Sequence, residues 1–512
     1  MSEGYSSAVF DNHTARESAL SEERLFRQQY GGKALGLVRL KSHENALGYT
    51  VPPFSLISTC FFDAFMTAYS QRYGHNFNNF SYLAERVEFP EPEKKMLQKI
   101  YEDVYDPYQP LVIRSSSVLE DQDDHQFKGI YHSEFLYPNS SDTFMNMGFE
   151  NFLKAVKKVF GSIYSQRAID YREQHGLGDD KMALVIMPVV GRGFDNPYGD
   201  FWTPAVSGVT LHTPYQPQTV ISEINIGLNT KTVQGQYDWR SAYSTTQGHS
   251  LAGTGYGSDA REESYGQHQV LNKYGIWANS FDGFPYIREY LIMQGLNPDN
   301  RGFEKKYMRK LFEIAQFLKS HYGVPIELEW SIDWKGELNI YQLRLLSYDQ
   351  FYEQAKKNPV KIEEVPHNRL VTQTEITSGH GEVLLPLKSY NTYDDMSSYQ
   401  NTQYGDCIAV IPLTVLTKDH FDLSCSQLME YGKRIKAVIL IGGNIPLGAH
   451  WAEFFISQNI PVVCVQSMSD INTQILDDYK IPERHNPKLW HTIIPFRLAV
   501  DGIKGIGQVH LP

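Results

Sequence analysis

The stretch IELEWSIDWKGELNIYQLRLL, residues 326–346, alternates apolar and polar side chains on both sides of a Trp-Lys-Gly turn. Strict alternation is typical of a β-strand, so the two runs and the turn predict a β-hairpin. Alternation gives each strand one polar face, made of Glu327, Glu329 and Ser331 on the first strand and of Gln342 and Arg344 on the second. Such a face is either solvated or, because its burial is costly, buried against a charged ligand.

Carboxylate and amide oxygens on these faces are hard ligands that suit Mg²⁺ where it bridges nucleotide phosphates. Two upstream stretches carry groups that suit the phosphates themselves. GGKALGL (31–37) combines glycines, a lysine and a helix start, a combination that is also common in purely structural turns. VIRSSS (112–117) places Arg114 at a strand end beside three hydroxyls, where the guanidinium either binds polyphosphate oxygens or pairs with Glu120 or Asp121.

The composition narrows the class of protein. A chain of 512 residues is long enough for roughly two to four domains. A net charge of −12 without a long Lys/Arg run argues against non-specific nucleic-acid binding. The N-terminus is polar, no apolar run reaches bilayer length, and Cys60, Cys407, Cys425 and Cys464 form no Cys-x-x-Cys pair. We therefore expect a soluble, cytoplasmic protein with neither nucleic acid nor membrane as partner.

The hydrophobic patterns divide the chain into two parts. The charged, proline-bearing stretch 351–375 indicates a linker between a domain at 1–350 and a smaller one at 376–512. In the smaller part, a helix at 450–458 between short apolar strands predicts a βαβ-like unit with parallel strands. In the larger part, we expect helices at 20–30, 31–40, 60–74 and 151–176, and strands at 110–117 and 181–190.

Four motifs in order carry a family resemblance: Lys33 in GGKALGL, VPPFSLIST (51–59), VIRSSSVLEDQDDHQFKGIYHSEF (112–135) and EWSID…ELNIYQLR (329–344). Together they resemble the nucleotide-binding domain of phosphoenolpyruvate synthase and pyruvate phosphate dikinase, over roughly residues 25 to 346. The resemblance implies an α/β and α+β multidomain chain. An ATP-grasp-like nucleotide-binding domain would precede a small swivelling β/β/α phosphohistidine domain.

The same resemblance implies roles for individual residues. Lys33 and Arg114 would contact the phosphates of ATP. Glu329 and Gln342 would hold the catalytic Mg²⁺, and Arg344 would stabilise the transferring phosphoryl group. Phosphoryl transfer depends on positioning and charge neutralisation, which a lysine, arginines and a metal ion supply. ATP and Mg²⁺ are therefore the expected cofactors.

His450, in PLGAHWAEFF (446–455), is on its own most simply a structural histidine. Gly442–Gly443 before it and Ile460–Val463 after it are similar to elements of the family's swivelling domain. By that resemblance His450 is the phosphocarrier, because neutral imidazole attacks phosphorus and the phosphoramidate passes the group on.

The chain departs from the family pattern in three ways. Gly448–Ala449 replace the Thr-Ser that precedes the family's histidine, and Thr230 stands where a loop glutamate is expected. From the same comparison we expect no counterpart in this sequence of the barrel domain that binds pyruvate in the full-length enzymes. We therefore expect the acceptor to be a different small molecule, or one held by a separate subunit.

The leading hypothesis is an ATP-dependent phosphotransferase of the dikinase type, which moves a phosphoryl group from ATP through a phosphohistidine to that acceptor. One alternative is an ATP-dependent ligase that activates a small metabolite by phosphorylation. The other is a degenerate nucleotide-binding partner subunit without turnover. The stretch 466–496 is unlike the family's compact domain, and it forms either a docking surface or a loop and helix without such a role.

Overall fold

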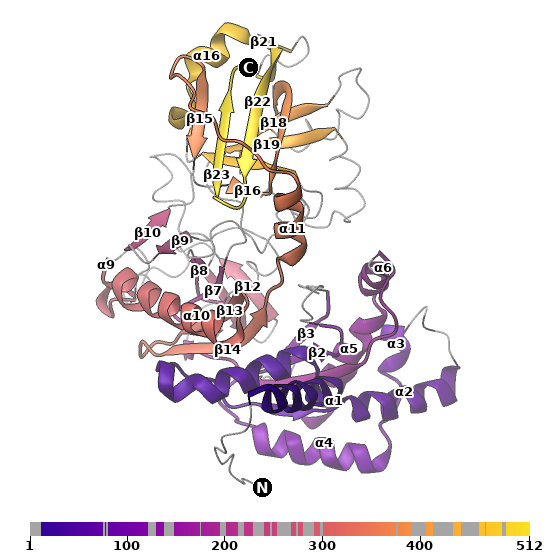
Figure 1. Ribbon diagram of the computed structural model, residues 1–512. Helices are drawn as coiled ribbons and strands as arrows, with labels where there is room; N and C mark the ends of the chain where they lie inside the picture. The colour runs from indigo at the N-terminus through magenta and orange to yellow at the C-terminus, as the bar shows by residue number, and fades with distance from the viewer. Residues whose placement is uncertain are drawn as a thin grey trace. The chain divides into compact units, whose positions relative to one another are not determined.

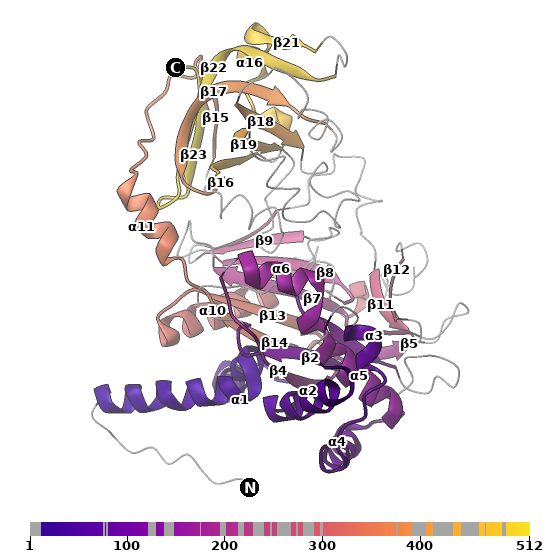
Figure 2. The same ribbon diagram turned by 90° about the vertical axis from the view of Figure 1, so that its right-hand side faces the viewer.

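The structure is a computed structural model, drawn as a ribbon in Figures 1 and 2. It describes residues 12–74, 77, 80–120, 130–137, 148–174, 176–194, 201–212, 220–228, 240–245, 248–252, 268–272, 275–279, 291–296, 301–374, 377–391, 406–412, 434–441, 460–465, 467–483 and 488–512. Within these ranges, no helix is both long and apolar enough to cross a bilayer.

The chain forms two compact units. The first contains residues 1–202, 271–275 and 339–344, and the second contains residues 203–270, 276–338 and 345–512. The division into domains that the sequence predicts, with a boundary near residue 350, stays a prediction. The predicted linker holds most of a helix, α11 (Asp349–Lys357), and a strand, β15 (Leu370–Thr374).

The first unit is built on a four-stranded antiparallel sheet in the order β1-β4-β2-β3. Its strands are β1 (Ser55–Ile57), β2 (Leu111–Ser117), β3 (Ser133–Leu136) and β4 (Met182–Pro188). Its helices are α1 (Asn12–Leu47), α2 (Thr59–Tyr73), α3 (Phe80–Ala84), α4 (Glu91–Val104), α5 (Phe149–Gly161), η1 (Ser162–Tyr164) and α6 (Gln166–Gln174). The unit also contains the short strand β5 (Arg192–Phe194) and parts of β6 (Phe201–Thr203) and β11 (His268–Asn272), which pair antiparallel at Phe201–Trp202 and Leu271–Asn272. The predicted helices and strands of this part are confirmed.

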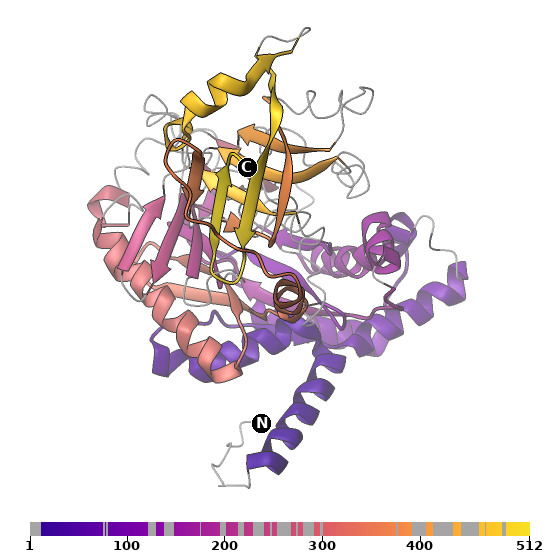
Figure 3. The same cartoon turned by 45° about the horizontal axis from the view of Figure 1, so that its top comes forward.

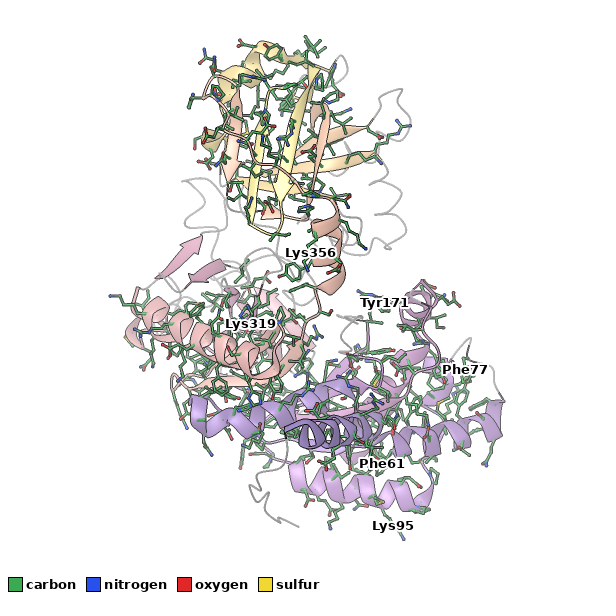
Figure 4. The ribbon with its side chains drawn as sticks, in the orientation of Figure 1. Phe61, Phe77, Lys95, Tyr171, Lys319 and Lys356 are labelled. Carbon is green, nitrogen blue, oxygen red and sulfur yellow. The ribbon has the colours of Figure 1, made fainter. Side chains whose placement is uncertain are left out.

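Aromatic side chains form much of the core of this unit. The ring of Phe65 lies 4.9 Å from that of Phe89 and 6.0 Å from that of Phe160, measured between centroids. Figure 4 labels Phe61 on α2, which is buried, and Lys95 on α4, which extends away from the unit. The amphipathic helices therefore fold because one face of each is covered by this core.

Helix α1 is broken by a kink at Gly31, as the glycine-rich stretch predicts, and Figure 3 shows its two segments pointing in different directions. Gly31 has φ 79°, and a Cβ built on it would lie 1.8 Å from the carbonyl oxygen of Ser116. Further along the helix, a Cβ on Gly36 would lie 2.4 Å from the carbonyl oxygen of Leu343. These glycines therefore allow close approach of two backbones, which is a structural role.

The second unit contains an antiparallel sheet in the order β10-β9-β8-β7-β13. Its strands are β7 (Val206–His212), β8 (Val220–Ile226), β9 (Arg240–Thr245), β10 (Gly248–Ala252) and β13 (Ile326–Ile332). Trp330 on β13 is fully buried, and its indole nitrogen donates to Thr210 Oγ1 at 2.8 Å. Helix α10 (Arg309–Tyr322) packs against β13 and β7. Strand β12 (Gly275–Asn279) and the short helices α9 (Arg301–Phe303) and η3 (Glu304–Met308) precede it.

A tight turn follows β13, where Asp333 N donates to Glu337 O and Gly336 N donates to Asp333 O. Strand β14 (Leu338–Leu345) begins directly after it. The strand, turn and strand therefore lie where the alternating sequence predicts them.

The C-terminal part of the second unit is a nine-stranded sheet in the order β15-β23-β22-β17-β18-β19-β20-β16, with β21 paired to β22 (Figure 2). Its further strands are β16 (Thr377–Ser378), β17 (Gly381–Ser389), β18 (Cys407–Pro412), β19 (Ile435–Ile441), β20 (Val462–Val465), β21 (Lys480–Pro482), β22 (Trp490–Asp501) and β23 (Ile506–His510). Strands β18, β19 and β20 are parallel neighbours, which confirms the predicted parallel pairing. The helix expected at 450–458 lies outside the described residues.

The described parts of the stretch 466–496 belong to the fold of this sheet. Helix α16 (Thr473–Tyr479) buries Ile475 and Leu476 in the same apolar cluster as Phe496 of β22. The short helix η5 (Met468–Asp470) precedes it, and β21 extends the sheet. These residues therefore help to form the core.

Replacing Gly31 by alanine is expected to destabilise the protein by about 3 kcal/mol or more. The new Cβ would overlap Ser116, and the alanine would have to adopt a positive φ that L-residues disfavour. Gly74→Ala is the matched control, since Gly74 has φ 67° with no atom within 4 Å of the new Cβ. It should cost about 1 kcal/mol. Thermal unfolding of both variants measures the difference, and equal losses would contradict the close approach.

His212, at the end of β7, is a buried histidine near α10. Its Nδ1 accepts a hydrogen bond from Ile326 N at 3.4 Å. Burial, assisted by the charge of Lys319 on α10 (Figure 4), lowers the pKa of His212 to about 4. The imidazole is therefore neutral in the folded protein at pH 7.

Acidification should weaken the fold through His212. The unfolded chain binds the proton near the ordinary pKa of about 6.5, so between pH 6.5 and about 4 the unfolded state holds more protons. The contribution of His212 to the free energy of unfolding is therefore present at pH 7 and is lost as the pH falls. At pH 5 the loss relative to pH 7 is about 2 kcal/mol. Thermal unfolding at pH 7 and pH 5 should show a smaller loss for His212→Gln than for the wild type. The exposed His367→Gln should keep the full loss, and an unchanged loss in His212→Gln would refute the assignment.

Candidate functional site

Lys33 lies in the first unit, just after the kink of α1, and only 8% of it is exposed. Its ammonium donates to Ser115 Oγ at 3.0 Å and forms an ion pair with the carboxylate of Glu120. A buried ammonium needs such acceptors, because leaving it unpaired costs several kcal/mol or more. Glu120 therefore pairs with Lys33, whereas the sequence offered it as a partner of Arg114.

The three serines at the end of β2 each have a partner in this unit. Ser116 Oγ accepts from Ala34 N at 3.0 Å and donates to Tyr30 O at 2.7 Å, so it bridges the kink of α1. Ser117 Oγ accepts from Glu120 N at 3.0 Å. The serine run therefore fixes α1 and the end of β2 around Lys33.

Arg114 is held by strand β14. One guanidinium nitrogen donates to Tyr341 O at 2.9 Å, and another donates to the side-chain oxygen of Gln342. The guanidinium also lies 5.6 Å from the centre of the Tyr341 ring. The structure thus brings together Arg114 and Gln342, two of the residues that the family resemblance assigns to the nucleotide site.

The polar strand faces are buried, so the solvated reading of them is wrong. On β13 the exposed fraction is 3% for Glu327, 7% for Glu329 and 1% for Ser331. On β14 it is 1% for Gln342 and 4% for Arg344. Charged and amide groups are seldom buried at this level without a function or a full set of partners.

In the side-chain amide of Gln342, only the oxygen has a hydrogen-bond partner among the described residues. Its Nε2 is buried and has no hydrogen-bond partner among the described residues, although its Oε1 accepts from Arg114. A buried NH₂ donor in this state is costly, which favours a further hydrogen-bond acceptor, such as a phosphate oxygen, at this position.

Glu329 belongs to the second unit. Val209 of β7 lies opposite it in the sheet, and Glu223 of β8 lies opposite Val209, so the two carboxylates share a face of the sheet. The described residues contain no group of three or more His, Cys, Asp or Glu that could hold a metal ion. Mg²⁺ typically takes one or two protein ligands together with phosphate oxygens and water, so a carboxylate and an amide are chemically sufficient for it.

A buried cluster in the first unit was not predicted from the sequence. Tyr131 donates to Asp180 Oδ2 at 2.5 Å, and Arg172 donates to Tyr131 at 3.4 Å. Asp180 also accepts from the backbone of Leu119 at 3.1 Å and of Lys181 at 2.8 Å. Burial raises the pKa of both Tyr131 and Asp180, and the nearby Asp180 charge raises that of Tyr131 further. The cluster anchors the residues on both sides of the segment 121–129.

The histidine that the sequence singled out, His450, lies outside the described residues, as do Gly448–Ala449 and Thr230. Among the described histidines, His380 follows a Thr-Ser-Gly sequence but is held on both ring nitrogens. Nε2 donates to Asn358 O at 2.6 Å, and Nδ1 accepts from Gly502 N at 3.0 Å. Because an attacking imidazole needs a bare nitrogen, His380 has a structural role.

Comparison with known proteins agrees with these features. The family model of the pyruvate phosphate dikinase AMP/ATP-binding domain matches residues 27–364. Phosphoenolpyruvate synthase of Aquifex aeolicus is 24% identical over 350 residues, which are 64% of this chain and 37% of the relative. A probable phosphoenolpyruvate synthase of Methanothermobacter thermautotrophicus is 22% identical over 385 residues, 74% of this chain and 46% of the relative.

A probable phosphoenolpyruvate synthase of Methanocaldococcus jannaschii is 34% identical over a shorter stretch of 107 residues, 20% of this chain and 8% of the relative. The chain thus spans less than half the length of these curated relatives.

Arg114→Lys is expected to lower the stability of the first unit by about 1–3 kcal/mol, because an ammonium cannot reproduce the fork that reaches Tyr341 and Gln342. The control is Arg309→Lys, which alters an exposed ion pair with Glu313 on α10 and should leave stability unchanged. Urea unfolding followed by circular dichroism compares them. Equal effects of the two substitutions would show that the fork contributes nothing.

Proposed function

The chain belongs to the family of the pyruvate phosphate dikinase AMP/ATP-binding domain, and from that premise we propose that it is an ATP-dependent phosphotransferase of the dikinase type. It would move a phosphoryl group from ATP through His450 to a small-molecule acceptor, or to one held by a separate subunit. The observation that carries the proposal is the buried or half-buried set Lys33, Arg114, Gln342 and Arg344, which lies within the matched residues.

The cations of this set would neutralise phosphate oxygens. The Lys33 ammonium is a compact charge, and the planar guanidinium of Arg114 can donate to two oxygens of one phosphate. Arg344 would stabilise the negative charge of the phosphoryl group during its transfer. Lys33 and Arg344 are buried and Arg114 is half-buried, so water screens these side chains less than at a surface and their interactions are stronger there.

Magnesium is the metal expected with ATP, and when bound it would neutralise phosphate charge and help to orient the phosphates. Glu329 and Gln342 are its proposed protein ligands. Burial of their side chains keeps competing water away, and the carboxylate supplies the negative charge that a divalent ion requires.

His450 would act as the nucleophile. A nitrogen of its neutral imidazole forms a bond to phosphorus while the bond from that phosphorus to the departing nucleotide oxygen breaks. The attacked atom is the β-phosphorus, so AMP leaves first, and water then cleaves the bond to the terminal phosphate. In sum, ATP, one water molecule and His450 give AMP, inorganic phosphate and phosphohistidine. The stretch that carries His450 joins β19 to β20, two adjacent parallel strands of the C-terminal sheet, as the family's swivelling domain leads us to expect.

Incubation with Mg²⁺ and ATP labelled at the β-phosphorus is expected to label the wild-type protein and to produce AMP and phosphate. His450→Asn should abolish the label, because an amide does not form the phosphoramidate. Peptide mapping under alkaline conditions, in which phosphohistidine survives, locates the group.

His367→Asn, which alters an exposed histidine of the same C-terminal part, is the control and should retain the label. Full labelling of His450→Asn would overturn the relay. ATP binding without any label or turnover would favour the nucleotide-binding partner subunit, and a phosphate-free joined product would favour the ligase.

A further inference from the structure

The ion-pair partner of Lys33 is itself an anion. The side chain of Glu120 is 2% exposed and that of Lys33 is 10% exposed, so the two charges neutralise one another away from bulk water. Because the buried ammonium needs a negative partner in every state of the protein, any phosphate that binds it takes the place of this carboxylate or shares the ammonium with it.

Glu120 is fixed independently of Lys33. Its second carboxylate oxygen accepts from Ser117 N at 3.2 Å, while Ser117 Oγ accepts from Glu120 N. This reciprocal pair is the capping-box arrangement, which orders a serine and a glutamate three residues apart. The adjacent Leu119 is tied through its backbone to Asp180. The carboxylate is therefore held in front of the ammonium by backbone contacts.

We propose that Glu120 is an internal substitute for a nucleotide phosphate: it holds the Lys33 ammonium in position until nucleotide binds, and it competes with that phosphate for the ammonium. The proposal rests on the proposed function, in which Lys33 contacts ATP. Its consequence is an ATP affinity lower than the cations alone would give, since part of the binding energy separates an existing ion pair.

The competition should depend on phosphate charge. Adenosine carries no phosphate and leaves the ion pair in place, whereas a phosphate of ATP competes with Glu120 for the ammonium. Removing the negative charge of Glu120 should therefore strengthen ATP binding without changing adenosine binding. A residue that only supports the fold would alter both ligands alike or neither.

The test is calorimetric titration of the full chain with ATP and with adenosine, in Mg²⁺ buffer. Glu120→Gln keeps the shape of the side chain and should bind ATP about ten-fold tighter than the wild type, with unchanged adenosine affinity. Glu134→Gln is the control, because Glu134 of β3 also pairs with a lysine of the same unit, Lys158 on α5. This substitution should leave both affinities unchanged.

Unchanged or weaker ATP binding by folded Glu120→Gln would overturn the proposal, while ATP binding by the wild type would still support the nucleotide site on which the proposed function rests. If neither protein binds ATP, both ideas fail. If Glu120→Gln does not fold, ATP binding by Glu120→Asp tests the proposal instead. Its shorter side chain withdraws the carboxylate from Lys33, so ATP binding should again tighten, and unchanged binding would count against the competition.

Discussion

The close approach of helix α1 to strand β2 at Gly31 is the constraint on which the first unit depends. Only a residue without a side chain fits beside the Ser116 carbonyl at this backbone conformation. The Ser116 hydroxyl then joins Tyr30 and Ala34 across the kink. The second segment of α1 consequently starts with Lys33 directed at the end of β2, where a buried ammonium must find negative charge.

The buried polar groups around β2 and β14 are better explained by a ligand than by stability. Apolar side chains of the same volume would fill these positions at lower cost, because burying charges removes more hydration energy than their pairing usually returns. The fork from Arg114 to Gln342 and the ion pair of Lys33 satisfy several of these groups. The amide nitrogen of Gln342 still has no partner within the described ranges, as expected where a further ligand binds.

Local pattern was enough to predict much of this structure. Alternation over 326–346 placed two strands and their turn, and the glycine-rich stretch placed the break in α1. The parallel pairing of β18, β19 and β20 followed from short apolar runs around a helical pattern. Such patterns can be read locally, because the burial of one face of an element fixes the spacing of apolar side chains over a few consecutive residues.

It was harder to predict which polar side chains pair with one another, because the partners are far apart in the chain. Glu120 was a candidate partner for Arg114, six residues away, but it pairs with Lys33 from another element. The cluster of Tyr131, Arg172 and Asp180 had no local signal at all, since each residue type is ordinary at its position. A serine three residues before Glu120 was the available hint that this carboxylate is fixed by the backbone.

A crystal structure of the protein with bound ATP tests the central claim most directly, because the account makes Lys33 and Arg114 the groups that receive the phosphates. It predicts phosphate oxygens within hydrogen-bonding distance of the Lys33 ammonium and the Arg114 guanidinium, with Glu120 moved away from Lys33. A nucleotide bound elsewhere, with the ion pair between Lys33 and Glu120 intact, would contradict it.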